Sequence, residues 1–343
     1  MKTWHLITPR ELKEFEQNEA PLKKGEARVK IFNVLLNSLD AMVYDGSMNA
    51  AYPLIPGRFA VGKVVSLEEE DAVSVEKGNR VFLNPILPDE HFTGDSTALL
   101  GMESVKVAGQ TCDGFLAPYV TLRTENLCVL PESVSTETAL YTYLIALAET
   151  ALDRIGEIKG KYIAVVGATA LGIILCQLLA YYQAVPVLID SRTTRLNFAR
   201  QCGVTYAFLN DENLDANINS ITGAAFADGA IYVASGNAVV NTVAFRVTAP
   251  QKSVVFCGFA PQSLQVNLEL ALKKQLHIIG VSDASENISS AINLLANKAV
   301  DVNRFSHRTY PLDDLPKAYA DSAAERGTDH NINLTIIDCY GKL

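Results

Sequence analysis

The stretch VVGATALG (residues 165–172) decides the fold of this chain. It overlaps the end of a short apolar run, Tyr162–Val166, which is typical of a buried β-strand, and it leads into Ala170–Tyr182, which has the length and composition of a helix. A second apolar run, Val185–Ile189, follows and is succeeded by Asp190. The stretch therefore predicts a strand–turn–helix–strand unit with glycines at the turn.

The two glycines of this stretch have the positions that a dinucleotide-binding turn requires. Gly167 permits a tight turn after the strand, and Gly172 lets the helix pack closely on it, so that the helix N-terminus faces a pyrophosphate. Thr169 replaces the middle glycine of the G-x-G-x-x-G pattern, and we expect its side chain to displace or weaken the cofactor. The alternative is a strand–helix unit that binds no nucleotide. The candidate cofactor-binding residues of the turn are Gly167, Thr169, Ala170, Leu171 and Gly172.

Asp190 stands 18 residues after the last glycine, at the end of the second strand. A carboxylate there accepts hydrogen bonds from both hydroxyls of an adenosine ribose and repels a 2′-phosphate, which favours NAD over NADP. Arg192 and Arg195 follow, either as solvated charges or as partial partners for a phosphate. We assign Arg195 to the cofactor site, together with Ser235 and Gly258 at the ends of two later strands.

The rest of the chain changes its pattern near residue 135. The first 130 residues carry short β-branched or apolar runs between Gly, Pro and Asp/Asn positions, which indicates an all-β region. Ser135–Ile155 has helical spacing, and apolar strands then alternate with helices, which predicts an α/β fold with a doubly wound parallel sheet. Two more helices and several strands are expected at Asn287–Ala299, Asp313–Ala324, Ala230–Ala234, Ser253–Gly258, His277–Gly280 and Asn333–Ile337.

Composition excludes several classes of function. Hydrophobic residues make up 49% of the 343 residues and charged residues 20%, which is typical of a globular protein of two domains. The net charge of −9 argues against nucleic acid as a partner. The sequence lacks an apolar run of the roughly 18 residues that a membrane span needs, and its N-terminus does not resemble a signal peptide. Six scattered cysteines are expected to be reduced thiols, so we expect a cytoplasmic protein with a small-molecule substrate.

An ordered set of short motifs extends over nearly the whole chain. They are NSLD (37–40) with DG (45–46), YPLIPG (52–57) leading into VGKVV (61–65), GNRV (78–81), DGFLAPY (113–119), LP (130–131), the glycine turn and YPL (310–312). In order and spacing they resemble the medium-chain dehydrogenase/reductase superfamily, which contains the zinc alcohol dehydrogenases and their zinc-free, quinone-reductase-like relatives.

This resemblance implies a fold and an assembly. It implies a GroES-like β domain over residues 1–150, a Rossmann dinucleotide-binding domain over residues 151–284, and a return to the first domain over residues 285–343, with the active site in the cleft between the domains. It also implies a homodimer or homotetramer that pairs through the edge of the Rossmann sheet, near Leu264–Gly280.

The positions of the zinc ligands are changed in this chain. By resemblance, the zinc enzymes have a Cys at the position of Asn37 in this chain. They have the His and Glu of a Gly-His-Glu motif at the positions of Arg58 and Phe59, and a third ligand near the position of Thr142. An amide, a guanidinium, a phenyl ring and a hydroxyl do not form a zinc site. The lobe Asn84–Gly109, where a structural zinc would need four ligands, has no cysteine. We therefore predict that the chain binds neither zinc ion.

Asn37 and Asp40 match the Asn-x-x-Asp motif of the zinc-free branch. We expect Asp40 to form an ion pair with Arg58, either as a structural link or as part of a substrate site. Without zinc, hydride transfer still requires a group that stabilises the developing negative oxygen, and Arg58 is suited to this because it can dock a carboxylate or polarise a carbonyl. Three tyrosines are further candidates, against the alternative of ordinary packed rings: Tyr44, Tyr52 and Tyr143. The candidate catalytic residues are Arg58, Asp40, Asn37 and Tyr44.

Two functions from different classes remain open. The first is a zinc-independent, NAD(H)-dependent oxidoreductase that transfers a hydride to or from a small carbonyl, alcohol or activated C=C substrate. The second is a catalytically silent relative that binds nucleotide or a partner. The second is credible because the zinc ligands and the middle glycine are replaced. In addition, Leu39 stands where the zinc enzymes, by resemblance, have the hydroxyl that relays the substrate proton.

Overall fold

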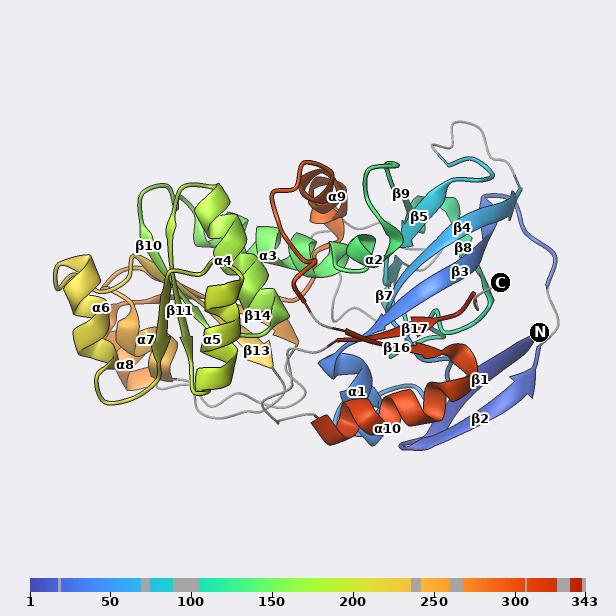
Figure 1. Cartoon of the computed structure of the whole chain (residues 1–343), viewed down its shortest axis with the longest axis horizontal. Coiled ribbons are helices and arrows are strands. Elements are labelled where there is room, and N and C mark those ends of the chain that lie inside the picture. Colours follow the sequence, from blue (N-terminus) through green and yellow to red (C-terminus); the bar gives the residue numbers. More distant parts are fainter. Residues whose placement is uncertain are drawn as a thin grey trace. The chain divides into compact units, whose positions relative to one another are not determined.

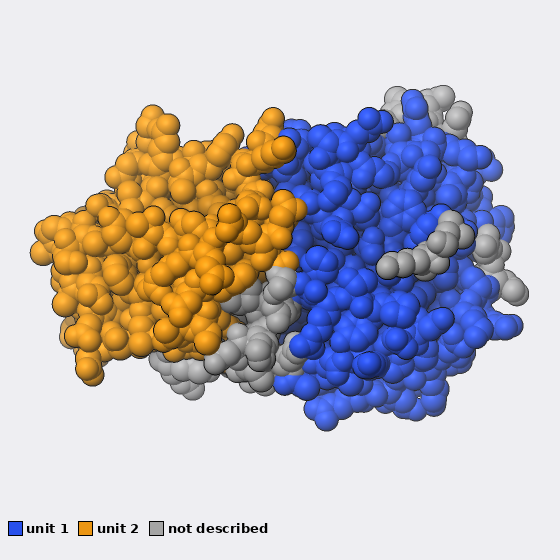
Figure 2. Space-filling model, in the orientation of Figure 1, with its two compact units in different colours: residues 1–143, 288–296, 306–343 blue, residues 144–287, 297–305 orange. Residues whose placement is uncertain are grey.

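The computed structural model describes residues 1–17, 20–68, 75–88, 105–235, 242–259, 268–305, 307–325 and 334–340. Most of the lobe predicted at residues 84–109 lies outside these ranges. The chain forms two units, coloured in Figure 2: unit 1 comprises Met1–Tyr143, Ile288–Ala296 and Ser306–Leu343, and unit 2 comprises Leu144–Asn287 and Asn297–Phe305. The domain boundaries expected at residues 150 and 284 stay a prediction.

Within the described ranges, no helix has both the length and the apolar character that crossing a membrane requires.

Unit 2 is built on a six-stranded sheet with the strand order β12-β11-β10-β13-β14-β15, and every pair in it is parallel (Figure 1). Its strands are β10 (Tyr162–Val166), β11 (Val185–Asp190), β12 (Tyr206–Leu209), β13 (Gly229–Ser235), β14 (Ser253–Phe259) and β15 (His277–Val281). The predicted doubly wound parallel sheet is thus confirmed. The order reverses between β10 and β13, and at such a point ligands bind beside the carboxyl ends of the strands.

Helices cover this sheet and enclose its core. They are α3 (Thr142–Ile155, beginning in unit 1), α4 (Ala170–Tyr181), α5 (Thr193–Gln201), α6 (Leu214–Thr222), α7 (Thr242–Val247) and α8 (Leu268–Lys274). α4 packs on β10 and β11, whereas α7 packs on β10 and β13. Nine of the twelve residues of α4 are buried, because a helix with apolar residues on nearly all sides needs a buried site.

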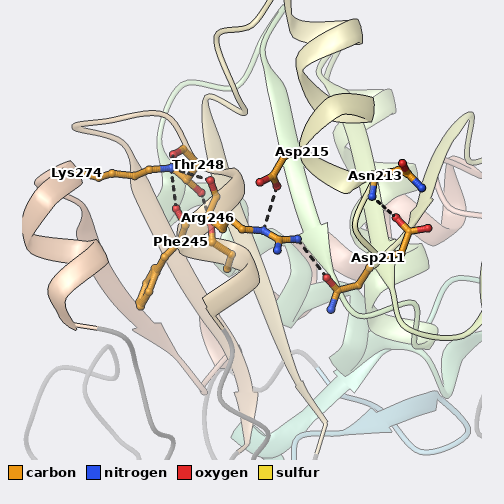
Figure 3. A network of polar contacts seen from close by, with 9 residues as sticks. Asp211, Asn213, Asp215, Phe245, Arg246, Thr248 and Lys274 are labelled. Carbon is orange, nitrogen blue, oxygen red and sulfur yellow. Dashed lines mark hydrogen bonds and ion pairs between the residues drawn. The ribbon is translucent and has the colours of Figure 1, made fainter.

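A lysine fixes the end of α7 to the end of α8 (Figure 3). The Nζ atom of Lys274 donates to the carbonyl oxygens of Phe245, Arg246 and Thr248, at 3.1, 2.7 and 2.7 Å. A cation at the C-terminal end of a helix satisfies carbonyl groups that have no partner within the helix. Burial lowers the pKa of Lys274, and the three carbonyl oxygens hold its ammonium group in place.

Unit 1 contains a mostly antiparallel sheet in the order β16-β17-β3-β4-β5-β9, with β8 also paired to β3. These strands are β3 (Glu26–Leu36), β4 (Phe59–Leu67), β5 (Arg80–Leu83), β8 (Tyr119–Arg123), β9 (Leu127–Val129), β16 (His307–Pro311) and β17 (Leu334–Asp338). Two smaller sheets pair β1 (Lys2–Thr8) with β2 (Glu11–Glu16) and β6 (Ile86–Pro88) with β7 (Val105–Val107). The helices of unit 1 are α1 (Ser38–Asp45), α2 (Thr136–Ala139), α9 (Ile288–Ala296) and α10 (Leu315–Glu325). Short 3-10 turns lie at η2 (Thr124–Asn126) and η4 (Leu312–Asp314) in unit 1 and at η3 (Ser285–Asn287) in unit 2.

The helix predicted over Ser135–Ile155 is divided into α2 and α3. Between them, the N–H groups of Leu140 and Tyr141 donate to carbonyls three residues earlier, and the hydroxyl of Thr142 donates to the carbonyl of Ala139, 2.7 Å away. These bonds tighten the chain into a turn at the position where helical spacing alone predicts continuity.

Candidate functional site

The glycine turn joins β10 to α4 in unit 2. Gly167 has a φ of +116°, which disfavours a side chain, and its N–H donates to the carbonyl of Ile189, 2.8 Å away. A Cβ on Gly172 would lie 1.9 Å from the carbonyl oxygen of Gly167, so that only glycine allows the helix to begin so close to the turn. The tight turn and the close helix packing expected of these two glycines are therefore present.

Thr169 caps the N-terminus of α4. Its hydroxyl oxygen accepts a hydrogen bond from the N–H of Gly172, at 3.3 Å. The N–H groups of Ala170 and Leu171, at the start of the helix, have no acceptor among the residues that the structure describes. A helix N-terminus with such donors suits a phosphate. The threonine therefore uses one donor of the helix end and leaves two for a diphosphate, and its expected interference with a cofactor stays a prediction.

Asp190 is the last residue of β11 and is only 8% exposed. Its Oδ2 accepts from the N–H of Ala168 at 2.7 Å, and its Oδ1 accepts from the N–H of Arg192 at 2.9 Å. The guanidinium of Arg195, on α5, lies 3.8 Å from the same Oδ2, and both side chains are less than a tenth exposed. The carboxylate thus links the glycine turn and α5 to the end of β11.

Two other candidate residues lie at the same edge of the sheet. β13 ends at Ser235, and Ala234 is paired with Gly258 of β14, which has a φ of +112°. β10 is flanked by β11 and β13, so the carboxyl ends of the four strands adjoin. The structure therefore brings the predicted cofactor residues together at one edge, whereas residues 236–241 and 260–267, which follow these strands, lie outside the described part of the chain.

In unit 1, Arg58 is almost completely buried, with 1% of its surface exposed. It lies between Gly57 and the start of β4, and its Nη2 donates to Oε1 of Gln110, 2.8 Å away. The backbone beside it is closely packed, since a Cβ on Gly114 would lie 2.2 Å from the carbonyl oxygen of Gly57. The fixed loop and the amide partner hold the guanidinium inside the unit.

Asp40 lies beside Arg58 and is 2% exposed. Its Oδ2 accepts from the backbone N–H of Asn37 at 3.0 Å, and Oδ1 of Asn37 accepts from the N–H of Leu39 at 2.7 Å, so the two side chains cap α1 reciprocally. Burial raises the pKa of Asp40 to about 6, although the positive charge of Arg58 acts in the opposite direction. Burial also lowers the pKa of Arg58, and Asp40 counters that shift. Each group therefore acts electrostatically on the other, whereas the expected ion pair between them stays a prediction.

Aromatic rings complete what we call the Arg58 cluster: Arg58, Asp40, Asn37, Gln110, Tyr44, Tyr143 and Tyr319. Tyr319 of α10 stacks on Tyr44 of α1, with ring centroids 4.8 Å apart and an angle of 22°. Tyr143 stacks on Phe59 at 5.1 Å. Both Tyr143 and Tyr319 are electrostatic neighbours of Arg58. Four segments distant in sequence therefore meet at one guanidinium.

Sequence reasoning missed Tyr319 and Gln110. Tyr319 lies in the helix predicted over Asp313–Ala324, but the sequence pattern does not show which of its buried positions contacts a charge. The Tyr319 hydroxyl and the Nδ2 of Asn37 are buried and have no hydrogen-bond partner among the described residues. The hydroxyl of Tyr52, one of the predicted candidates, instead donates to the carbonyl of Val43.

The residues of this cluster do not fit a zinc ion. A cationic guanidinium repels a metal, and the cluster provides one carboxylate but neither thiolate nor imidazole. Thr142, near the third ligand position of the zinc enzymes, uses its hydroxyl to bond Ala139. Across the described ranges, the structure has no group of three or more His, Cys, Asp and Glu side chains that could hold a metal. Burial raises the pKa of the Cys112 thiol to about 11, which keeps it protonated.

Family comparisons cover both units. Residues 23–132 match the model of the alcohol dehydrogenase GroES-like domain, and residues 170–297 match that of the zinc-binding dehydrogenase family. An uncharacterized zinc-type alcohol dehydrogenase-like protein of Haemophilus influenzae is 22% identical over 274 residues, which is 79% of each chain.

Solved structures are similar over the whole chain. A putative zinc-binding dehydrogenase of Sinorhizobium meliloti bound to NADP is 18% identical, with a TM-score of 0.85, over 98% of this chain and 99% of that one. A short chain alcohol dehydrogenase of Escherichia coli complexed with NADH is 21% identical, with a TM-score of 0.84, over 99% of both chains. At these identities the likeness shows the fold alone.

Proposed function

Because this chain belongs to the medium-chain dehydrogenase/reductase superfamily, a class of nicotinamide-dependent oxidoreductases, we propose that it is a zinc-independent, NAD(H)-dependent enzyme. It transfers a hydride to or from a small carbonyl, alcohol or activated C=C substrate. The observation that carries this proposal is the charge of Arg58, because a permanent cation stands where the metal-binding histidine of the zinc enzymes is expected.

The glycine turn is the proposed site of the cofactor, which supplies the hydride when bound. The N–H groups of Ala170 and Leu171 bind its diphosphate, while Gly167 and Gly172 keep the helix end near it. Asp190 and Arg195 lie at the adenosine end. Ser235 and Gly258 are proposed to line the nicotinamide side of the same sheet edge.

The Arg58 cluster is proposed to replace the metal in stabilising a substrate oxygen. Arg58 contributes a fixed positive charge, and the buried donors of Asn37 and Tyr319 are suited to an oxygen acceptor. Asp40 holds the guanidinium and the start of α1 in position. Tyr44 is proposed as the proton donor, because its ring is stacked on Tyr319 and its side chain is only partly buried.

A catalytically silent relative is the second candidate function. It is favoured by the near-complete enclosure of Arg58 and Asp40, which a substrate reaches only if the cluster opens. This relative binds nucleotide or a partner without turnover, so that nucleotide binding alone does not establish the first candidate, whereas its absence favours the second.

We further propose a homodimer or homotetramer that forms through the free edge of the unit 2 sheet. β15 is the last strand in the sheet order, and exposed apolar side chains lie on it and on α8: Leu268 is 59% exposed, Leu272 77% and Ile278 46%. An edge strand with apolar neighbours favours pairing with a second copy. Residues 264–267 of the predicted interface lie outside the described part of the chain. Light scattering that gives a monomer contradicts this proposal.

A cytoplasmic location is proposed because all six cysteines are free thiols. Small molecules are the proposed substrates.

Three measurements test the proposed function. A thermal shift with NADH is expected, because a ligand that binds only the folded state must stabilise it. Elemental analysis of protein produced with added zinc should find no stoichiometric metal, and chelation should leave the thermal midpoint unchanged. NADH oxidation should occur with at least one member of a panel of small aldehydes, ketones and enones. Bound zinc contradicts the metal-free assignment, and dinucleotide binding without any turnover supports the silent relative.

A further inference from the structure

We propose that a pocket on the unit 1 sheet binds a small organic cation with two or more ammonium groups, which is the chemistry of a linear diamine or polyamine. The pocket has a volume of about 860 Å³, within the range of small-molecule sites. We call it the β17 pocket, and its lining includes Phe32, Glu137, Thr309, Pro311, Asp338 and Tyr340. Among the described residues, it shares none with the glycine turn or the Arg58 cluster, so this inference is independent of the proposed function.

The floor of the β17 pocket is formed by two strands of the sheet. Thr309 and Pro311 of β16 line it, and Pro311 is paired with Asp338 of β17. Side chains two residues apart on a strand point to the same face of a sheet. The intervening Tyr310 points to the other face, where its hydroxyl donates to Oδ2 of Asp321 on α10, 2.7 Å away. Because α10 packs on β16 and β17 there (Figure 1), the β17 pocket opens on the face that this helix leaves uncovered.

Two aromatic rings line the pocket. Phe32 of β3 and Tyr340 are in edge-to-face contact, with ring centroids 5.5 Å apart and an angle of 73°. The Nζ atom of Lys30 lies 3.9 Å from the centroid of the Tyr340 ring, and Tyr340 is still 43% exposed. An ammonium group is attracted by the negative face of such a ring. The protein itself therefore places one ammonium group at this wall, which indicates the chemistry that the wall accepts.

Two carboxylates add negative charge to the pocket. Glu137 lies in the first turn of α2 and is exposed, whereas Asp338 is the last residue of β17. Oδ1 of Asp338 accepts from the backbone N–H of Tyr340 at 3.0 Å, which holds this carboxylate near the aromatic residue. In the described part of the chain, the side chain of Glu137 forms neither a hydrogen bond nor an ion pair. The pocket therefore offers one carboxylate that lacks a protein partner and a second one beside the rings.

These groups together select the class of ligand. Carboxylates and aromatic faces both attract ammonium groups, and the two carboxylates come from separate segments of the chain. A ligand with two charges joined by an apolar chain satisfies both, while its methylene groups cover Phe32 and Pro311. A hard metal ion is a poorer match, because it requires oxygen ligands where this pocket has rings and a proline. The net charge of −9 also attracts cations to the chain.

Calorimetric titration of the full chain with spermidine and putrescine at constant ionic strength tests this inference. We expect a single saturable site, with spermidine bound more tightly than putrescine. Butane-1,4-diol, which has the carbon chain of putrescine without its charges, should not bind. Absence of saturable binding of either amine overturns the inference, as does displacement of spermidine by an equal concentration of magnesium ion, which indicates a counterion effect only. Such a failure leaves the proposed function intact, because dinucleotide binding is measured separately.

Variants of the lining locate the site. Asp338→Asn and Glu137→Gln should each weaken spermidine binding by about threefold, because each removes one partly exposed ion pair. Tyr340→Leu should weaken it by a similar factor, whereas Tyr340→Phe, which keeps the aromatic face, should not change it. Glu16→Gln is the control, since it neutralises an exposed carboxylate of β2 that does not line the pocket. An equal effect of Glu16→Gln and the two pocket variants contradicts the assigned site.

Lys30 provides a test of opposite sign. Its ammonium group competes with the ligand for the ring of Tyr340, so Lys30→Met should strengthen spermidine binding by about threefold. Lys13→Met removes a lysine of β2 whose side chain is 57% exposed, and it should leave the affinity unchanged. Weaker binding by Lys30→Met, or equal gains in both lysine variants, contradicts recognition at this ring. Circular dichroism checks that each variant folds, and if Asp338→Asn does not, Glu137→Gln and Lys30→Met still decide the inference.

Discussion

The glycine turn of unit 2 and the Arg58 cluster of unit 1 are candidate sites of opposite construction. The turn is local: its backbone donors and its glycines come from eight consecutive residues, with one carboxylate from the next strand. The cluster is assembled from α1, the start of β4, the loop at Gln110 and α10, and its central group is a side chain. A site built from backbone donors depends on the conformation of its turn, whereas a site built from side chains changes its chemistry when one residue is replaced.

The largest expected effect comes from removing the centre of the cluster. Arg58→Ala should lower the free energy of unfolding by about 3–5 kcal/mol, because it leaves Asp40 buried without its cation and opens a cavity. Chemical denaturation measures this. Lys63→Ala, which removes an exposed cation from β4, the strand that follows Arg58, should change stability by less than about 0.5 kcal/mol. The double variant Arg58→Ala/Asp40→Asn should recover the electrostatic part of the loss, and a loss below about 1 kcal/mol for Arg58→Ala contradicts the central position of this residue.

In the turn, Gly172→Ala should destabilise the protein by about 1–3 kcal/mol, because its Cβ would meet the carbonyl oxygen of Gly167. It should also weaken dinucleotide binding, since the helix end must move. Lys63→Ala, at an exposed position of β4, is the control, because it introduces no steric conflict. Equal stability of the two variants, measured by denaturation, contradicts the close packing at the turn.

The pH dependence of stability tests the buried carboxylate of the cluster. The pKa of Asp40 is about 6 in the folded state, against about 3.9 in an unfolded chain, so the folded state binds more protons between these values. The contribution of Asp40 to stability therefore falls as the pH rises, and it should fall by about 1 kcal/mol between pH 5 and pH 7. The stability difference between the wild type and Asp40→Asn isolates this contribution. A difference that grows with pH has the wrong sign for a buried acid.

The smallest expected change in stability concerns the cap of α4. Thr169→Gly should cost only about 0.3 kcal/mol, because glycine is tolerated at the N-cap position. It restores the middle glycine of the fingerprint, so NADH should bind more tightly, as measured by calorimetry. An unchanged affinity shows that the threonine side chain does not limit the approach of the cofactor.

The sequence predicts the local site better than the assembled one. The boundaries expected for β10 and α4 agree with the structure within one residue. The reason is that the apolar strand, the glycine turn and the helix are each specified by residues that are consecutive in sequence. The sheet of unit 2 is also predicted, apart from β12, a strand of only four residues. The β1–β2 hairpin was missed, because the ELKEFE sequence of β2 is largely charged and most of it is exposed.

The Arg58 cluster is predicted only in part by the sequence. Asp40 and Arg58 were found through their resemblance to positions in a known family. Gln110 and Tyr319 were missed, because contacts between segments so distant in sequence depend on tertiary packing that a residue pattern does not contain. The engagement of Asp190 by Ala168 and Arg195 was missed for a related reason: the pattern gives the position of the carboxylate but not the hydrogen bonds it has already made.

The pairing of β17 with β3 has a consequence for synthesis on the ribosome. It joins Leu36 to Thr335, so β3 is made long before this neighbour exists, and at 5–20 residues per second the interval is about 15–60 s. The strands of the parallel sheet, by contrast, all come from residues 162–281. The nascent chain can therefore complete that sheet first, while β3, whose residues 26–30 pair with β8, keeps an open edge over residues 33–36 that is prone to misassociation. Chaperones that shield strand edges should bind translation intermediates that stop before residue 334 more strongly than the released protein.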